Sequence, residues 1–508
     1  MSNKLDSIPK CEPYMGHRLG APDPPAGRSL SASILRCLAL VGVLVNAGLF
    51  VWVTANRLTF PFDLEVLEGW VADCALRVLR GQPLYAEPSF SFIPMMYGPV
   101  HPYVLAGLMK LLGTGYWVGR LLSVVSSLAT CFFVGAMVGR RGGRTLGVMF
   151  GLLVLGLYAP TEYWMDLIRV DSLQMALTAG ALWMVDRSSS RKSIVAAGLL
   201  LTASAFTKPT TGLLLIGFPI IIMLRDRRWR WDAVFSTWVP GVVILLMMCL
   251  LTGGWYWDFQ VVYPARHQLL WKRAWHVFVD LGVRQYPMLL LGGICVYASR
   301  RLRRASWIRD PLLVSLLLVG PAGMLACLKH GGWINSYLVA LPLLIAVAGM
   351  TAAHVQRTGT LGQSAVSVAV LLQSLLWIHN PGQLIPQRGA YQTVAQVRRA
   401  LAGFQRPWFP QHGFVLSSRG GPIFCHEHGV RDLVRHRIPS DEFVRFVRSF
   451  AETGVDVIVS ENRPGDHGLL TPFFANFVLG STIDVDALSH GWWGLPTDRL
   501  YVYVPRDR

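Results

Sequence analysis

The sequence predicts an α-helical polytopic membrane protein with about eleven transmembrane helices, followed by a small C-terminal α/β domain. Two observations carry this prediction. Of the 508 residues, 53% are hydrophobic and only 15% are charged, which leaves too little polar surface to enclose the apolar content in a soluble globule. The net charge of +18 comes from basic residues that gather in short clusters between apolar runs, which is the pattern of cytoplasmic loops. The basicity therefore indicates membrane topology and not nucleic-acid binding.

The N-terminal residues 1–30 are rich in Pro, Gly and Ser and are expected to form a disordered cytoplasmic tail. The apolar run at 34–55 is interpreted as an uncleaved signal anchor, since crossing a hydrocarbon core needs roughly 20 residues. Basic clusters at 140–144, 187–192, 225–230 and 300–309, and Arg357, then mark cytoplasmic turns. The expected spans are 34–55, 116–138, 145–160, 172–186, 193–206, 210–224, 233–252, 286–299, 311–328, 336–354 and 361–378.

This topology places the N-terminus in the cytoplasm and the C-terminus outside. Residues 31–379 then form the transmembrane domain, with a first outer loop at 56–115, and residues 380–508 form an extracytoplasmic α/β domain. The run at 100–112 is too short to span, so it is expected to be an interfacial helix on the outer surface.

In the C-terminal domain, short buried strands are expected at 414–417, 455–460 and 500–504, and an amphipathic helix at 440–453. No glycine-rich phosphate fingerprint accompanies them, so no nucleotide is assigned. The cysteines show no paired spacing, and a disulfide between Cys74 and Cys425 stays open.

The first outer loop concentrates acidic residues among apolar neighbours. Glu68 opens a predicted helix, where the helix dipole favours an ionised carboxylate that can act as a general base. A simple helix cap explains Glu68 equally well. Asp63 and Glu65 also suit a hard divalent cation, and Asp73 also suits a solvated helix face.

A second charged group follows the third span. Its members are Glu162, Asp166, Arg169 and Asp171, and helical spacing places Asp166 and Arg169 on one face. Two readings stay open: a surface ion pair, or an internal network that orients the first loop's acids or a metal.

Cations on the outer face need a separate account, because the positive-inside tendency disfavours them there. They are candidates for gripping an anionic group such as phosphate, with lipid headgroups as the alternative, preferred for Arg273 and Arg284. The candidates are Arg120, Lys208, Arg266, His267, Lys272, Arg273, Lys329 and His330. Aromatic residues at 255–275 are typical of an interfacial belt, with one or two available to stack on a sugar ring. A zinc site at Cys425, His426 and His428 is not expected, because no second ligand cluster exists.

The order of these parts resembles the GT-C superfamily of membrane glycosyltransferases, which includes protein O-mannosyltransferases, lipid A aminoarabinose transferases and the bacterial glycosyltransferase families 39 and 87. An acid-Gly pair precedes a helix, and aromatic-Pro and His-Pro segments follow it. Gly98 departs from the pattern, since proline is common there. The likeness covers roughly the first half of the chain. The segments are Glu68-Gly69, Gly81-Gln82-Pro83-Leu84-Tyr85, Tyr97-Gly98-Pro99, His101-Pro102, Gly113, Arg120-Leu121-Leu122-Ser123, Arg169-Val170-Asp171-Ser172 and Phe206-Thr207-Lys208-Pro209.

The resemblance implies an inverting transfer of a hexosyl or pentosyl group from a polyprenyl-phosphate donor, on the outer face of a bacterial inner membrane. Glu68 is the first choice for the base, with Asp63 or Glu65 behind it, and Asp166 and Asp171 are supporting acids. A divalent cation stays open, with Asp63, Glu65 and Asp166 as candidate ligands. The candidate substrate-binding residues are Tyr97, His101, Arg120, Arg169, Lys208, Arg266, His267, Lys329 and Asn335.

The main rival is a multi-pass transporter or a lipid-linked-sugar flippase. Transporters usually contain internal repeats and helices that are interrupted near the bilayer midplane, whereas this sequence shows no repeat and its polar residues group on one face. A structural subunit whose tail binds a partner is a third reading, but it leaves the acidic loop unexplained.

Overall fold

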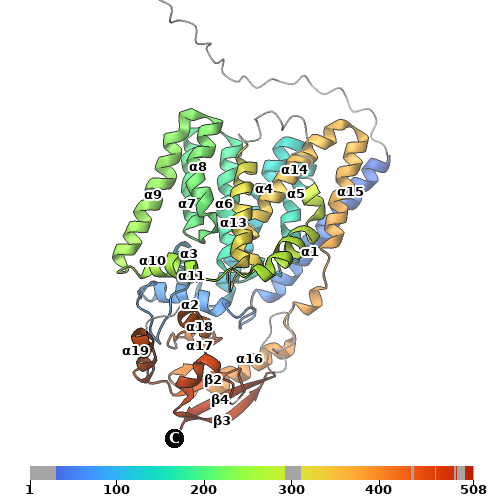
Figure 1. Cartoon of the computed structure of the whole chain (residues 1–508). Helices are drawn as coiled ribbons and strands as arrows, with labels where there is room; N and C mark the ends of the chain where they lie inside the picture. The colour runs from blue at the N-terminus through green and yellow to red at the C-terminus, as the bar shows by residue number, and fades with distance from the viewer. Residues whose placement is uncertain are drawn as a thin grey trace, which may run out of the picture.

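The computed structural model describes residues 30–291, 310–435, 440–463, 465–485, 488 and 498–506. The expected N-terminal tail, the expected span at 286–299 beyond residue 291, and the basic cluster at 300–309 lie outside this part of the chain. Long helices stand side by side as a bundle, and the C-terminal domain covers one end of it (Figure 1).

The bundle confirms the predicted fold class, because an apolar helix coincides with each expected span except 286–299. Five described helices are long and apolar enough to cross a membrane, at Leu30–Arg57, Tyr116–Gly142, Arg227–Leu251, Leu338–Thr358 and Thr360–Gln383. The apolar side chains of Phe235, Leu246 and Leu250 on α9 are exposed at the periphery of the bundle, as a lipid-facing surface requires. The bundle helices are α1 (Leu30–Arg57), α4 (Tyr116–Gly142), α5 (Arg144–Gly156), α6 (Val170–Arg187), α7 (Arg191–Ala205), α8 (Gly212–Arg225), α9 (Arg230–Leu251), α13 (Pro311–Leu328), α14 (Leu341–Val355) and α15 (Thr360–Leu376).

Short elements gather at the end of the bundle that carries the C-terminal domain (Figure 1). Helix α2 (Glu68–Leu79) begins at the predicted residue, and α3 (Val100–Leu112) matches the expected short helix. The long loop after α9 contains short helical turns, among them α10 (Trp255–Trp257) and α11 (Tyr263–Arg266), and a π-helix at His276–Arg284.

The C-terminal domain is a four-stranded sheet with helices, and its strand order is β1-β2-β4-β3. Strand β1 (Pro407–Trp408) pairs parallel with β2 (Val457–Ser460), while β4 (Arg499–Pro505) pairs antiparallel with both β2 and β3 (Phe477–Asp484). The helices are α16 (Arg388–Leu401), α17 (Phe414–Ser417), α18 (Glu427–Arg435) and α19 (Ser440–Ala451). The strands expected at 455–460 and 500–504 and the helix expected at 440–453 are confirmed.

The strand expected at 414–417 is wrong, because these residues form α17. Phe414 packs edge-on against Tyr116 at 4.8 Å between ring centroids, and the Ser417 hydroxyl donates to Asp73. Residues three apart share one face of a helix but point to opposite faces of a strand. Packing of residues 414–417 on α2 and α4 therefore favours a helix. The same packing buries Asp73, so the alternative that Asp73 lies on a solvated helix face is wrong.

The C-terminal domain and the first loop share one hydrophobic core. Phe90 from the loop contacts Trp408 at 4.5 Å between ring centroids, and its carbonyl accepts a hydrogen bond from the Cys425 N–H at 2.8 Å. Cys74 and Cys425 are both buried free thiols, so the disulfide that stayed open does not form in this structure. The domain is thus packed directly onto the loop.

Gly98, the departure from the family pattern, is explained by a close backbone contact. Its N–H donates to the Thr207 carbonyl at 3.2 Å, and the Val100 N–H donates to the Phe206 carbonyl at 3.1 Å. A Cβ at position 98 would overlap the Phe206 carbonyl group. A proline would also lose the donor. Glycine therefore lets the segment after Tyr97 pair with the segment before Lys208.

Gly98→Ala should lower the free energy of unfolding by about 2–3 kcal/mol, because the added methyl group forces two backbone segments apart. Thermal unfolding of the full chain in detergent measures this. Gly107→Ala in α3 is the matched control, since a Cβ there meets nothing within 4 Å. Equal unfolding temperatures for the two variants would contradict the contact.

Candidate active site

Glu68 lies in a closed ion pair at the start of α2. Its Oε1 accepts from Arg120 Nε at 3.1 Å and from the Ile168 N–H at 2.9 Å. Its Oε2 accepts from Arg120 Nη2 at 2.7 Å and from the Leu64 N–H at 2.6 Å. Burial opposes ionisation, but Arg120 outweighs it and lowers the pKa of the Glu68 carboxyl. The first-choice base is therefore ionised but already saturated with donors.

Arg120 fixes the path of the chain between α1 and α2. Besides Glu68, its guanidinium donates to the carbonyl groups of Arg57 at 3.0 Å, Phe60 at 2.6 Å and Phe62 at 2.6 Å. Because Arg120 is 1% exposed, all these partners are desolvated with it. We call residues 57–68, whose shape this side chain sets, the acidic loop.

Glu65 occupies a different environment, three residues before Glu68. Its Oε2 accepts from Arg169 Nη1 at 3.2 Å and from the Leu67 N–H at 3.1 Å. Burial raises the pKa of the Glu65 carboxyl to about 7, against the opposing effect of Arg169. A carboxylate with this pKa is suited to accept and release a proton near neutral pH.

Tyr97 stands at the centre of a buried polar cluster, which we call the Tyr97 cluster. Its hydroxyl accepts from Arg169 Nη2 at 2.7 Å, and Lys208 Nζ lies 5.8 Å from its ring centroid. Lys208 donates to Asp171 Oδ1 at 2.7 Å and to the Asn335 carbonyl at 3.2 Å. Segments that are far apart in sequence thus bring two cations and two carboxylates, counting Glu65, around one aromatic ring.

His101 lies near the same cluster as a fully buried neutral ring. Burial lowers its pKa to about 4, with Asp171 opposing this shift and Arg169 adding to it. Neither ring nitrogen has a hydrogen-bond partner among the described residues. Such buried polar atoms are rare in folded proteins and call for an explanation.

The remaining predicted cations lie elsewhere. Arg120 belongs to the Glu68 pair. His267 Nδ1 lies 2.8 Å from the His330 carbonyl oxygen, and Lys329 Nζ donates to the Pro264 carbonyl at 3.1 Å. These contacts hold the loop after α9 against the residues that follow α13. Arg266 precedes His267 at the end of α11.

Of the two readings for Asp166 and Arg169, the surface ion pair does not form, and the contacts are those of an internal network that reaches the first loop. Residues Trp164–Asp166 form a separate 3-10 turn, and α6 starts only after Arg169, so helical spacing does not apply. Asp166 pairs with Arg57 at 3.3 Å instead, and Arg169 turns to Glu65. Asp166 and Asp171 therefore serve as counter-ions of Arg57 and Lys208.

The three candidate metal ligands do not converge. Glu65 faces Arg169 and Asp166 faces Arg57, while Asp63 accepts from Tyr116 at 3.0 Å and pairs with His412 Nδ1 at 2.8 Å. In the described part of the chain, no three His, Cys, Asp or Glu residues are grouped to hold a metal ion. As arranged, these acids do not fit a divalent cation.

Sequence reasoning missed two contributors to this region. Gln260 donates from Nε2 to the Tyr97 carbonyl at 2.6 Å, and His412 of the C-terminal domain contacts Asp63. Gln260 carries no charge that could have drawn attention to it. His412 lies 349 residues after Asp63 and belongs to no motif.

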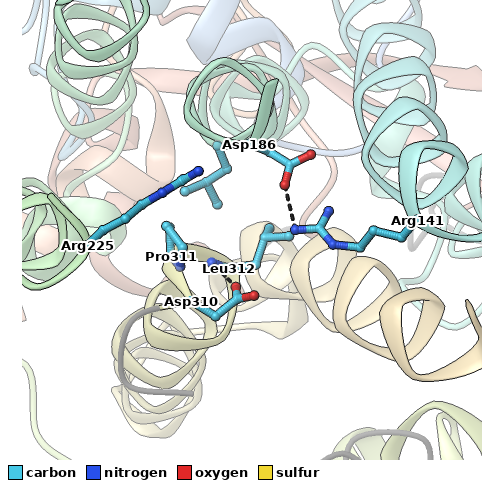
Figure 2. Close-up of a pocket in the computed structure, with 7 residues that line it drawn as sticks. Arg141, Asp186, Arg225, Asp310, Pro311 and Leu312 are labelled. Carbon is cyan, nitrogen blue, oxygen red and sulfur yellow. Dashed lines mark hydrogen bonds and ion pairs between the residues drawn. The ribbon is translucent and has the colours of Figure 1, made fainter. Parts of the chain in front are cut away.

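Figure 2 shows a polar pocket between helices of the bundle. Its volume is about 220 Å³, and Arg141, Asp186, Arg225 and Asp310 line it. Arg141 pairs with Asp186 at 2.5 Å. Because Arg141 follows Arg120 by 21 positions on α4, roughly 30 Å separates them at 1.5 Å per residue. This pocket therefore belongs to the turns expected in the cytoplasm.

Glu68→Ala should destabilise the protein by about 3–5 kcal/mol, because it leaves Arg120 buried without its counter-ion. Unfolding temperatures in detergent report the loss. Glu68→Gln with Arg120→Met should recover part of it, since the buried charge is removed as well. If the single variant unfolds at the wild-type temperature, the pair does not anchor the acidic loop.

Comparisons with known proteins agree with this architecture. Residues 96–256 match the family model described as dolichyl-phosphate-mannose-protein mannosyltransferase, and no curated protein sequence matches the chain. The crystal structure of ArnT from Cupriavidus metallidurans bound to undecaprenyl phosphate is similar, with a TM-score of 0.53 at 16% identity over 90% of this chain and 97% of that chain. The apo oligosaccharyltransferase of Archaeoglobus fulgidus gives a TM-score of 0.50 at 10% identity over 84% and 69%. The family model agrees with the resemblance to the GT-C superfamily over residues 96–256, and the likenesses to solved structures confirm the helical polytopic fold.

Proposed function

We propose that this protein is an integral-membrane glycosyltransferase that moves a sugar from a polyprenyl-phosphate donor to an acceptor on the outer face of the membrane. The observation that carries the proposal is the placement of Arg169 and Lys208 around Tyr97, beside Glu65. Departure of a lipid phosphate needs cations, and activation of an acceptor needs a base. The family model and the ArnT complex with undecaprenyl phosphate support this donor class.

The proposed step is a single displacement at the anomeric carbon of the sugar. The acceptor oxygen or nitrogen bonds to that carbon and gives its proton to Glu65. The bond from the carbon to the phosphate oxygen breaks, and the phosphate keeps the electron pair. Arg169 and Lys208 neutralise the charge that develops there. Attack opposite to the leaving group inverts the anomeric configuration.

Glu65 replaces Glu68 as the first choice for the base. Each oxygen of Glu68 accepts two hydrogen bonds, whereas the Leu67 N–H and Arg169 both donate to Glu65 Oε2. An incoming phosphate competes for Arg169, and this competition frees the Glu65 carboxylate. Glu68 then acts through its pair with Arg120, as an anchor. No step is assigned to a divalent cation, because each candidate ligand faces a cation of the chain itself.

The proposed setting is a bacterial inner membrane, with the basic turns in the cytoplasm and the Tyr97 cluster outside. The lipid-linked donor reaches the cluster from the bilayer. The proposed group transferred is a hexosyl or a pentosyl group.

Purified full-length protein in proteoliposomes should release undecaprenyl phosphate from at least one member of a panel of undecaprenyl-phosphate hexoses and pentoses. Release of the carrier and transfer to added acceptors are both measured by chromatography. A flippase would move the intact donor across the bilayer without cleaving it. Translocation without cleavage across the whole panel would overturn the proposal in favour of that rival.

Glu65→Gln should lower kcat by about 10²–10⁴-fold, because the amide cannot accept the acceptor's proton. In the wild type, the pKa raised to about 7 keeps the carboxyl protonated at lower pH. Its kcat should therefore rise with pH through about 7 and level off above it.

Stopped-time transfer assays between pH 5 and pH 9 give both results. Glu87→Gln is the control, since that carboxyl lies in the same outer loop with its side chain 65% exposed. A Glu65→Gln variant with the wild-type kcat would remove Glu65 from the role of base.

A further inference from the structure

His412 links the C-terminal domain to the acidic loop through a buried ion triad. Its Nδ1 lies 2.8 Å from Asp63 Oδ2, and its Nε2 contacts Glu461 Oε1, which follows β2. The side chains of His412, Asp63 and Glu461 are 6%, 1% and 8% exposed. One ring therefore bridges two carboxylates from different parts of the fold, away from water.

The contacts define the charge of the ring. A neutral imidazole has one donor and one acceptor nitrogen, whereas an imidazolium donates from both. Burial lowers the pKa of His412, but the carboxylates of Glu461 and Asp63 outweigh this and raise it to about 9. His412 is therefore a cation between two anions at neutral pH.

Other titratable groups face this triad from each element packed around it. Tyr116 on α4 donates a hydrogen bond to Asp63. The charge of Glu68 on α2 raises the pKa of Asp63, and the charge of Asp63 raises the pKa of Asp73 on the same helix. From the C-terminal domain, His426 feels the charge of His412. The carboxylates in contact with His412 favour the protonated form of its ring.

Gly69 shows how closely the triad is fitted to α2. A Cβ at this position would lie 2.9 Å from Asp63 Oδ1 and 3.2 Å from the Phe414 Cβ. The same Asp63 oxygen is buried without a hydrogen-bond partner among the described residues. The absence of a side chain at Gly69 therefore lets both Asp63 and the C-terminal domain approach the start of α2.

We propose that His412 is a positioning residue, through which the C-terminal domain holds the acidic loop in the arrangement that sugar transfer requires. Arg120 holds this loop from the membrane side. His412 holds it from the outer side through Asp63, which lies two residues before Glu65. The proposal rests on the proposed function. Loss of the outer contact leaves Asp63 to rearrange, and a displacement of about 1 Å at a reacting group can cost 10²-fold in rate.

The test uses the full-length protein in proteoliposomes with the variants His412→Gln, Asp63→Asn and their combination. His412→Gln should lower kcat at least about tenfold while the donor KM stays within about twofold, because the Tyr97 cluster that grips the donor is intact. The double variant should be no slower than the slower single variant, since partners in one network are not additive.

His467→Gln is the matched control, because that ring stacks on Phe474 within the C-terminal domain, at 3.8 Å between centroids. It should keep the wild-type kcat. An unchanged kcat in His412→Gln, or additive losses in the double variant, would overturn the proposal.

Glu461→Gln keeps the contact between His412 and Asp63, and it serves if His412→Gln fails to fold. Above the plateau, deprotonation of His412, whose pKa is about 9, should release Asp63 and lower the wild-type kcat. Removal of the Glu461 carboxylate lowers the pKa of His412, so in Glu461→Gln this fall should begin at lower pH than in the wild type. A purely structural role for Glu461 would leave the pH profile in place, and that result would count against the proposal.

The unfolding temperatures of the same variants separate this proposal from the proposed function. If the wild type transfers no sugar, the proposed function fails and the positioning role fails with it. The same measurement still tests whether His412 and Asp63 interact. Equal unfolding temperatures for the single and double variants support this contact, and additive decreases in unfolding temperature refute it.

Discussion

The guanidinium of Arg120 is the constraint on which the outer end of the molecule depends. It is buried on α4, and it gathers Glu68 and three carbonyl groups of the acidic loop. A buried charge without partners costs several kcal/mol, so the loop must fold around this side chain. The turn that delivers Glu68 to Arg120 also presents Glu65 to Arg169. The arrangement proposed for catalysis thus follows from the need to pair one buried cation.

The acidic loop is held from two sides, and its three acids therefore differ in their partners and in their ionisation. Arg120 keeps Glu68 ionised on the membrane side, while His412 pairs with Asp63 on the side of the C-terminal domain. Glu65 lies between these anchors, and burial outweighs its one arginine and raises its pKa to about 7. One short segment therefore supplies an anchor, a link between domains and the proposed proton acceptor.

The sequence predicted what local physics determines. Apolar length located the bundle helices, and the position of Glu68 marked the start of α2. The positive-inside tendency singled out cations such as Lys208, which the structure places beside Tyr97. The sequence did not predict the contacts that depend on tertiary packing. The apolar run at 414–417 fits a strand or a helix until α2 is packed against it. Asp166 ends a 3-10 turn, and Arg169 precedes α6. Nothing local connects His412 with Asp63.

The central claim is that Glu65, and not Glu68, changes its protonation state near neutral pH. Infrared titration of the carboxyl stretching band tests this most directly, in an Asp73→Asn background because burial raises the pKa of Asp73 to about 7 as well. The account predicts a band that fades as the pH rises through about 7, that disappears in Glu65→Gln and that persists in Glu68→Gln. A band that persists in Glu65→Gln and disappears in Glu68→Gln would contradict it.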